Sequence, residues 1–253
     1  LTAANVEAGD AATLKAGTDL KAANVTAGEA ATLKAGTELN AQNVKSDNGT
    51  ATLTAVTKLT AQNVTAKGDA VLRAGADLTA NDVKAGGTAD LHSQKAMETG
   101  SISADTVKLH AEDGDIHSDG AVRANKDASV STGTQGAIKL AKGLTAGKDI
   151  TFTTKNGDML FGGDIHSTGG NITATIAAQG NIGQIGDAKV SVKADAKGIG
   201  NVSIRNSGTG DVDLHRVYAD RDVRVSLAHG NIHVYEINGA LVAVALTDAD
   251  KKM

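Results

Sequence analysis

Apolar residues recur along the first part of the chain in short triplets of an apolar, a variable and a small residue. In the first copy the triplets are Leu1-Thr2-Ala3, Val6-Glu7-Ala8 and Leu14-Lys15-Ala16. Side chains alternate between the two faces of a β-strand, so the outer members of a triplet share one face. The middle member varies freely between copies, as a solvent-facing position does. The pattern predicts three short strands with one aliphatic face each.

The triplets return at a nearly fixed interval, because the leading leucines lie 19, 19, 20 and 19 residues apart at Leu1, Leu20, Leu39, Leu59 and Leu78. The single extra residue falls in the segment KSDNGTAT, which marks that segment as a loop. One such unit cannot bury its own inner face, whereas stacked units bury it against each other. No window carries the periodicity of a helical repeat. We therefore expect an all-β solenoid of triangular coils of roughly 19–20 residues.

A polar residue precedes the second apolar position of every copy. The series is Asn5, Asn24, Asn43, Asn63 and Asp82. Asn and Asp tolerate the left-handed backbone region best among the non-glycine residues, so the series predicts a corner of the coil. Stacked in register, the same side chains are expected to form a hydrogen-bonded ladder. The alternative is a row of polar ligands for an ion; we favour the corner, because the coil needs a turn there.

The rhythm changes after Leu91. The segment HSQKAMETGS separates Leu91 from Ile102, and we interpret His92–Gly100 as a bulged loop or an excursion from the coil. Further on, Gly followed by Asp or Asn and an aliphatic residue recurs, with spacings of 10, 20, 10 and 20 residues between Gly170, Gly180, Gly200, Gly210 and Gly230. This is turn chemistry at half-coil intervals. We predict one continuous β-helix over 1–253, with regular repeats in 1–95, looser coils in 96–243 and a tail in 244–253.

The composition predicts the kind of core and excludes some classes of partner. The chain has no Trp, Pro or Cys and only two Phe and two Tyr, so a narrow core of Ala, Val, Leu and Ile is expected. The net charge of -4 and the lack of a Lys/Arg cluster among aromatics predict no nucleic-acid partner. No apolar run approaches the roughly 20 residues that cross a bilayer, so no stable membrane insertion is expected. The start on a repeat boundary suggests an internal piece of a longer protein.

The densest chemistry lies in HAEDGDIHSDG, which gathers His110, Glu112, Asp113, Asp115, His117 and Asp119. Carboxylates at 112–119 are the candidate site of a polysaccharide lyase or hydrolase; the competing interpretation, which we favour, is a solvated turn. His117 and His166 are expected to point outward. His229 and His233 lie about 13 Å apart if they share one strand, too far for one metal ion. We predict no catalytic, cofactor-binding or metal-binding residue, and no cofactor.

The LxAxNV…AGxxATLxAG repeats, the G-D/N-I turns and the missing Cys and Trp resemble filamentous haemagglutinin-like exoproteins of two-partner secretion systems. The resemblance covers nearly the whole chain. It implies a right-handed parallel β-helix, export through an outer-membrane partner transporter, and a secreted or cell-surface location in a Gram-negative bacterium. The expected function is a non-catalytic shaft or adhesive segment. A host or bacterial cell-surface receptor is the expected partner, with His92–Gly100 as the candidate contact.

Overall fold

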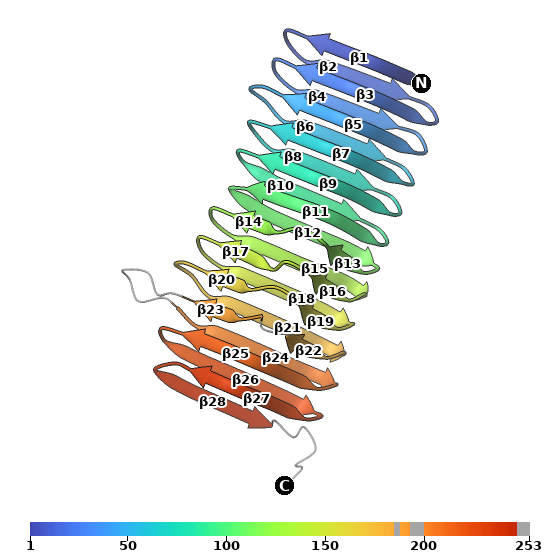
Figure 1. The fold of residues 1–253 in the computed structure, drawn as a ribbon. Coiled ribbons are helices and arrows are strands. Elements are labelled where there is room, and N and C mark those ends of the chain that lie inside the picture. Colours follow the sequence, from blue (N-terminus) through green and yellow to red (C-terminus); the bar gives the residue numbers. More distant parts are fainter. Residues whose placement is uncertain (185–187, 193–199, 247–253) are drawn as a thin grey trace.

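The computed structural model describes residues 1–184, 188–192 and 200–246, which form a stack of parallel β-strands (Figure 1). Two sheets run the length of the stack, and each coil of the chain adds to both. The second sheet has 12 strands, one from each coil, which gives about twelve coils. The predicted all-β solenoid is confirmed. Its described residues contain no helix long and apolar enough to cross a membrane.

The first sheet begins with one strand per coil and then divides into two rows of short strands before it reunites at β25. Its undivided strands are β1 (Thr2–Ala8), β3 (Leu20–Ala27), β5 (Leu39–Ser46), β7 (Leu59–Ala66), β9 (Leu78–Ala85), β11 (Met97–Ala104), β25 (Val212–Ala219) and β27 (Ile232–Asn238). One row of short strands is β13 (Ile116–Ser118), β16 (Ile138–Leu140), β19 (Met159–Phe161) and β22 (Ile182–Gln184). The other is β14 (Val122–Ala124), β17 (Leu144–Ala146), β20 (Ile165–Ser167) and β23 (Val190–Val192).

The second sheet is a single row in which the strands lengthen from β12 onward. Its strands are β2 (Ala12–Ala16), β4 (Ala31–Ala35), β6 (Ala51–Ala55), β8 (Ala70–Ala74), β10 (Thr88–Ser93), β12 (Thr106–Asp113), β15 (Ala128–Gln135), β18 (Ile150–Asn156), β21 (Ile172–Gln179), β24 (Val202–Thr209), β26 (Asp222–His229) and β28 (Leu241–Leu246). The early strands have 5 residues, whereas β15 and β21 have 8.

The core is a column of aliphatic side chains between the two sheets. The outer members of the triplets face inward as predicted, and Leu20, Val25 and Leu33 are at most 1% exposed. Stacking in register brings each of them against its counterpart in the next coil. Phe152 and Phe161 fill the core further along, with ring centroids 4.9 Å apart. The predicted narrow aliphatic core is confirmed.

The corner predicted at the asparagine series is wrong, because the backbone there continues as a β-strand. Asn24 lies inside β3, where Ala23 and Asn24 both face outward and shift the inward alternation by one residue. The first two triplets therefore share one strand, and no described non-glycine residue has a positive φ. The predicted ladder does form: Asn24 donates to Asn5 at 2.7 Å, Asn43 to Asn24 at 2.7 Å and Asn63 to Asn43 at 2.8 Å. These amide bonds support two successive outward residues without a turn.

The excursion predicted at His92–Gly100 is also wrong. His92 and Ser93 end β10, and Met97 begins β11 in register with Leu78. Met97 takes the inward place of a leading leucine and is fully buried. The segment is therefore one more regular coil, in which a methionine replaces leucine.

From β12 to β23 each coil has three separate strands, one in the second sheet and two in the first, which makes its cross-section triangular. The β15 strand ends at Gln135, and Gly136 then turns the chain with a φ of 134° into β16. Buried side chains hold this corner from inside: the Thr132 and Thr154 hydroxyls both donate to the Gly136 carbonyl oxygen at 3.0 Å. Gly170 precedes β21 and Gly180 precedes β22, so these glycines do stand before strands as expected. The half-coil spacing is wrong for this coil, because in-register Asn171 and Asn201 are 30 residues apart.

The last described strand is β28, which pairs with β26. It covers the beginning of the predicted tail, and residues 247–253 lie outside the described part of the chain. Leu241, Val244 and Leu246 are 53%, 48% and 66% exposed. This end of the stack thus presents apolar side chains to solvent.

Candidate functional site

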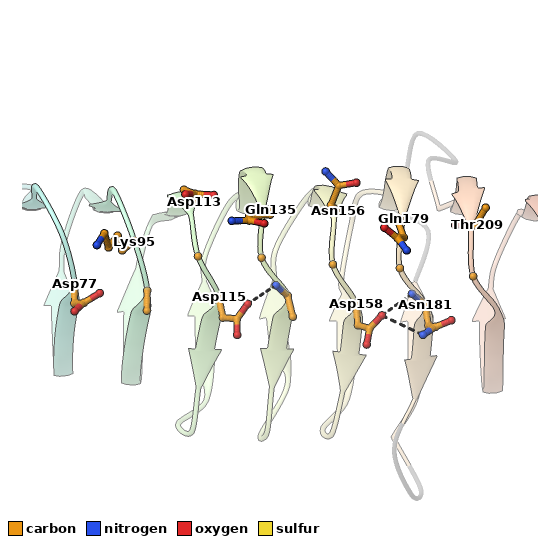
Figure 2. Close-up of a pocket in the computed structure, with 17 residues that line it drawn as sticks. Asp77, Lys95, Asp113, Asp115, Gln135, Asn156, Asp158, Gln179, Asn181 and Thr209 are labelled. Carbon is orange, nitrogen blue, oxygen red and sulfur yellow. Dashed lines mark hydrogen bonds between the residues drawn. The ribbon is translucent and has the colours of Figure 1, made fainter.

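A groove of about 940 Å³ runs along one corner of the stack, where the second-sheet strands end and the chain enters the first sheet (Figure 2). It crosses successive coils and takes the same few positions from each of them. Its lining residues are Asp77, Lys95, Ala96, Asp113, Gly114, Asp115, Gln135, Gly136, Ala137, Asn156, Gly157, Asp158, Gln179, Gly180, Asn181, Thr209 and Gly210. Aspartates outnumber the single lysine in this set, so the groove is acidic as well as polar.

One wall consists of the last residues of the lengthened second-sheet strands. Asp113 is in register with Gln135, Asn156 with Gln179, and Gln179 with Thr209. Figure 2 shows these side chains as one row across successive coils. Parallel coils are about 4.8 Å apart, so the wall offers a polar group at that interval.

The facing wall consists of the residue that follows each corner glycine. Asp115 accepts a hydrogen bond from the Ala137 backbone N–H at 2.7 Å. Asp158 accepts from the backbone N–H of Asn181 at 2.7 Å and from its side-chain amide at 3.1 Å (Figure 2). Each carboxylate thus binds a backbone amide of the next coil. The turn role predicted for the Gly-Asp and Gly-Asn pairs is confirmed.

Glycines form the floor between the two walls. Gly157 has a φ of 139°, and a Cβ atom there would lie 2.2 Å from the Gly136 carbonyl oxygen. Successive coils therefore approach each other too closely for any side chain. The floor stays bare, and an extended polar molecule can lie along it within reach of both walls.

The acidic stretch at 112–119 does not converge on one point. Asp113 and Asp115 enter opposite walls of the groove. Asp119 Oδ1 lies 3.0 Å from His117 Nε2, and Glu112 contacts histidines on the outer face of the second sheet. Four carboxylates that are close in sequence therefore serve three different places.

Glu112 lies with His92 and His110 in a cluster that the sequence reasoning missed. Its Oε1 atom is 3.5 Å from His92 Nε2 and 3.2 Å from His110 Nε2. The two rings stack with centroids 5.2 Å apart and planes 10° from parallel. The hydrogen bond and charge of His110, and less strongly those of His92, hold the pKa of Glu112 below its usual value. Among the described residues, these are the three whose potential ligand atoms lie within 4.8 Å of one another.

Three other histidines contact partners that are not histidines: His117 lies near Asp119, His215 near Asp213 and Tyr235, and His166 near Ser191. His166 bonds the Ser191 hydroxyl through Nδ1 at 2.8 Å. His117 and His166 point outward, as predicted. His229 ends β26 in the second sheet, whereas His233 lies in β27 of the first. They are on different sheets rather than on one strand.

Comparisons of the chain with protein-family models, curated proteins and solved structures returned no match. The likeness to haemagglutinin-like exoproteins therefore rests on the repeat residues themselves.

Proposed function

We propose that this chain is a non-catalytic shaft or adhesive segment of a secreted, surface-exposed bacterial exoprotein of the haemagglutinin-repeat kind. The observation that supports it is the continuous parallel pairing that links each coil to the next from β1 to β28. Stacked repeats of this kind form stiff rods with long lateral surfaces. Export through an outer-membrane partner transporter and binding to a cell-surface receptor belong to the same proposal.

The groove supports the adhesive form of the proposal. It offers hydrogen-bonding groups coil after coil, and its floor admits close approach because it carries no side chains. Repeated polar groups along a line suit a hydroxyl-rich linear polymer, such as a surface glycan, better than a compact ligand. The groove, which includes Lys95 and Ala96 of the segment His92–Gly100, replaces that segment as a whole as the candidate contact, since the segment is a regular coil and not an excursion.

Binding of the labelled, folded chain to epithelial and bacterial cells tests the proposal. We expect saturable binding that Gln135→Trp abolishes, because the indole would fill the groove from an exposed wall position. Ser129→Trp is the matched control: it lies on the same strand, faces outward and does not line the groove.

Three results would revise the proposal differently. Undiminished binding by Gln135→Trp would place adhesion outside the groove. A folded chain that binds no cell would leave the shaft form and remove the adhesive one. Release of new reducing ends or unsaturated sugars from a polysaccharide would contradict both forms and support the enzyme hypothesis.

A further inference from the structure

Two consecutive coils place matching histidines on the outer face of the second sheet. His92 in β10 and His110 in β12 are register partners, and each follows a buried leucine, Leu91 or Leu109. In-register parallel strands hold outward side chains about 4.8 Å apart. The stacked rings are the result, and both Nε2 atoms point to the same Glu112 oxygen.

From this geometry we propose that His92, His110 and Glu112 bind a divalent transition-metal ion of the zinc and copper class. Two imidazole nitrogens and a carboxylate oxygen are a ligand set that such ions favour. The three ligand atoms already lie within 4.8 Å of one another. A bound ion would replace the contacts between Glu112 and the two rings with three metal–ligand bonds.

The surroundings of His110 support a metal-binding role. Its Nδ1 atom lies 2.8 Å from the Ser131 hydroxyl of the next coil. Metal-binding histidines commonly use their second ring nitrogen in such a bond, which fixes the ring and leaves the first nitrogen for the ion. Ser131 is therefore a positioning residue for the site.

The charge next to the cluster is also compatible with a cation. Arg73 precedes His92 in the same outward row, but its guanidinium bonds the Asp90 carboxylate and, at 2.8 Å, the Asp90 carbonyl oxygen. Its charge is thus balanced within the neighbouring coil. The ligand side chains are 26% (His92), 35% (His110) and 46% (Glu112) exposed, so an ion can reach them directly from solvent.

The site would join two coils and keep a free position on the ion. His92 comes from one coil and the other two ligands from the next, so an ion would crosslink β10 to β12. Three protein ligands leave the fourth position of a tetrahedral ion open to water or to an added ligand. This inference does not depend on adhesion, because it concerns a different face of the stack.

Titration of the purified chain with Zn²⁺, followed by calorimetry and thermal unfolding, tests the inference. We expect one saturable site and a rise in Tm with Zn²⁺. His92→Ala and His110→Ala should each weaken binding at least tenfold, and Ser131→Ala about tenfold. His166→Ala is the matched control, since His166 has the same Nδ1–hydroxyl bond without a second histidine; it should bind Zn²⁺ like the parent chain.

A second measurement does not rely on the variants. Electron paramagnetic resonance of the parent chain with one equivalent of Cu²⁺ should show coupling to two imidazole nitrogens. Coupling to one nitrogen, or undiminished Zn²⁺ binding by the folded His92→Ala/His110→Ala double variant, would overturn the inference. The absence of saturable Zn²⁺ binding by the parent chain would overturn it as well.

Discussion

The early and late coils both stack as parallel strands, but their second-sheet strands and the turns that follow differ in length. In the early coils, a second-sheet strand such as β4 has 5 residues, and the turn 36–38 leads into β5. In the late coils, β15 has 8 residues, and only Gly136 and Ala137 separate it from β16. The added residues lie at the C-terminal end of the strand. The last residue of a lengthened strand such as β15 is polar and lies beside a tight glycine corner. The groove runs along these lengthened coils.

The two regions also differ in how polar groups join one coil to the next. In the early coils the ladder through Asn24 and Asn43 joins side chain to side chain, and carboxylates such as Asp19 also accept from the backbone N–H of the next coil. Late coils use carboxylates that accept from the backbone of the next coil, as Asp158 does from Asn181. The carboxylate bonds of the late coils accompany a glycine-floored groove. The groove is lined mainly by the late coils, although the aliphatic core is common to both regions.

The largest effect should come from a charge in that common core. Val25→Asp places a carboxylate where the side chain is 1% exposed, and we expect a loss of about 4 kcal/mol or more in the free energy of unfolding. Ile172→Asp in a late coil should be equally severe, since Ile172 is also 1% exposed. Chemical denaturation followed by circular dichroism measures both.

Lys21→Asp is the control for this prediction, because Lys21 lies in the same strand and faces solvent. It should be nearly neutral. Equal effects of Lys21→Asp and Val25→Asp would contradict the inward and outward assignment. A severe effect in only one region would show that the two regions do not share one kind of core.

The next largest effect on stability should come from a substitution at a glycine corner of the late region. Gly157→Ala adds a Cβ atom 2.2 Å from the Gly136 carbonyl oxygen at a φ of 139°, so we expect a loss of about 3 kcal/mol. Gly183→Ala is the matched control, because its Cβ would make only ordinary contacts, with the Leu160 side chain at 3.6 Å and the Asp213 carbonyl oxygen at 4.0 Å. Thermal unfolding measures the stability of both variants. Equal melting temperatures would contradict the assignment of Gly157 to a tight corner.

The sequence predicted the inward residues of the coils, because alternation in a strand is a local rule. It misplaced the corner at Asn24, because the stabilising amide bonds come from neighbouring coils. It took Met97 for part of a loop, since methionine replaces the expected leucine. Predicting the groove, or the pairing of His92 with His110, requires knowledge of the register between successive coils. Hydrogen-bonded side-chain partners lie 19 residues apart at Asn24 and 30 apart at Asn201, so a fixed repeat does not give that register.

The smallest effect concerns the early region alone. Asn43 donates to Asn24 and accepts from Asn63, and Asn43→Ala removes both bonds. We expect a loss of about 1 kcal/mol, because the ladder is exposed and water can replace part of each bond. The neighbouring outward residue gives the control, Gln42→Ala, which should cost less. If chemical denaturation gives both variants the same stability, the ladder accompanies the strand without stabilising it. The two outward residues would then be held by backbone pairing alone.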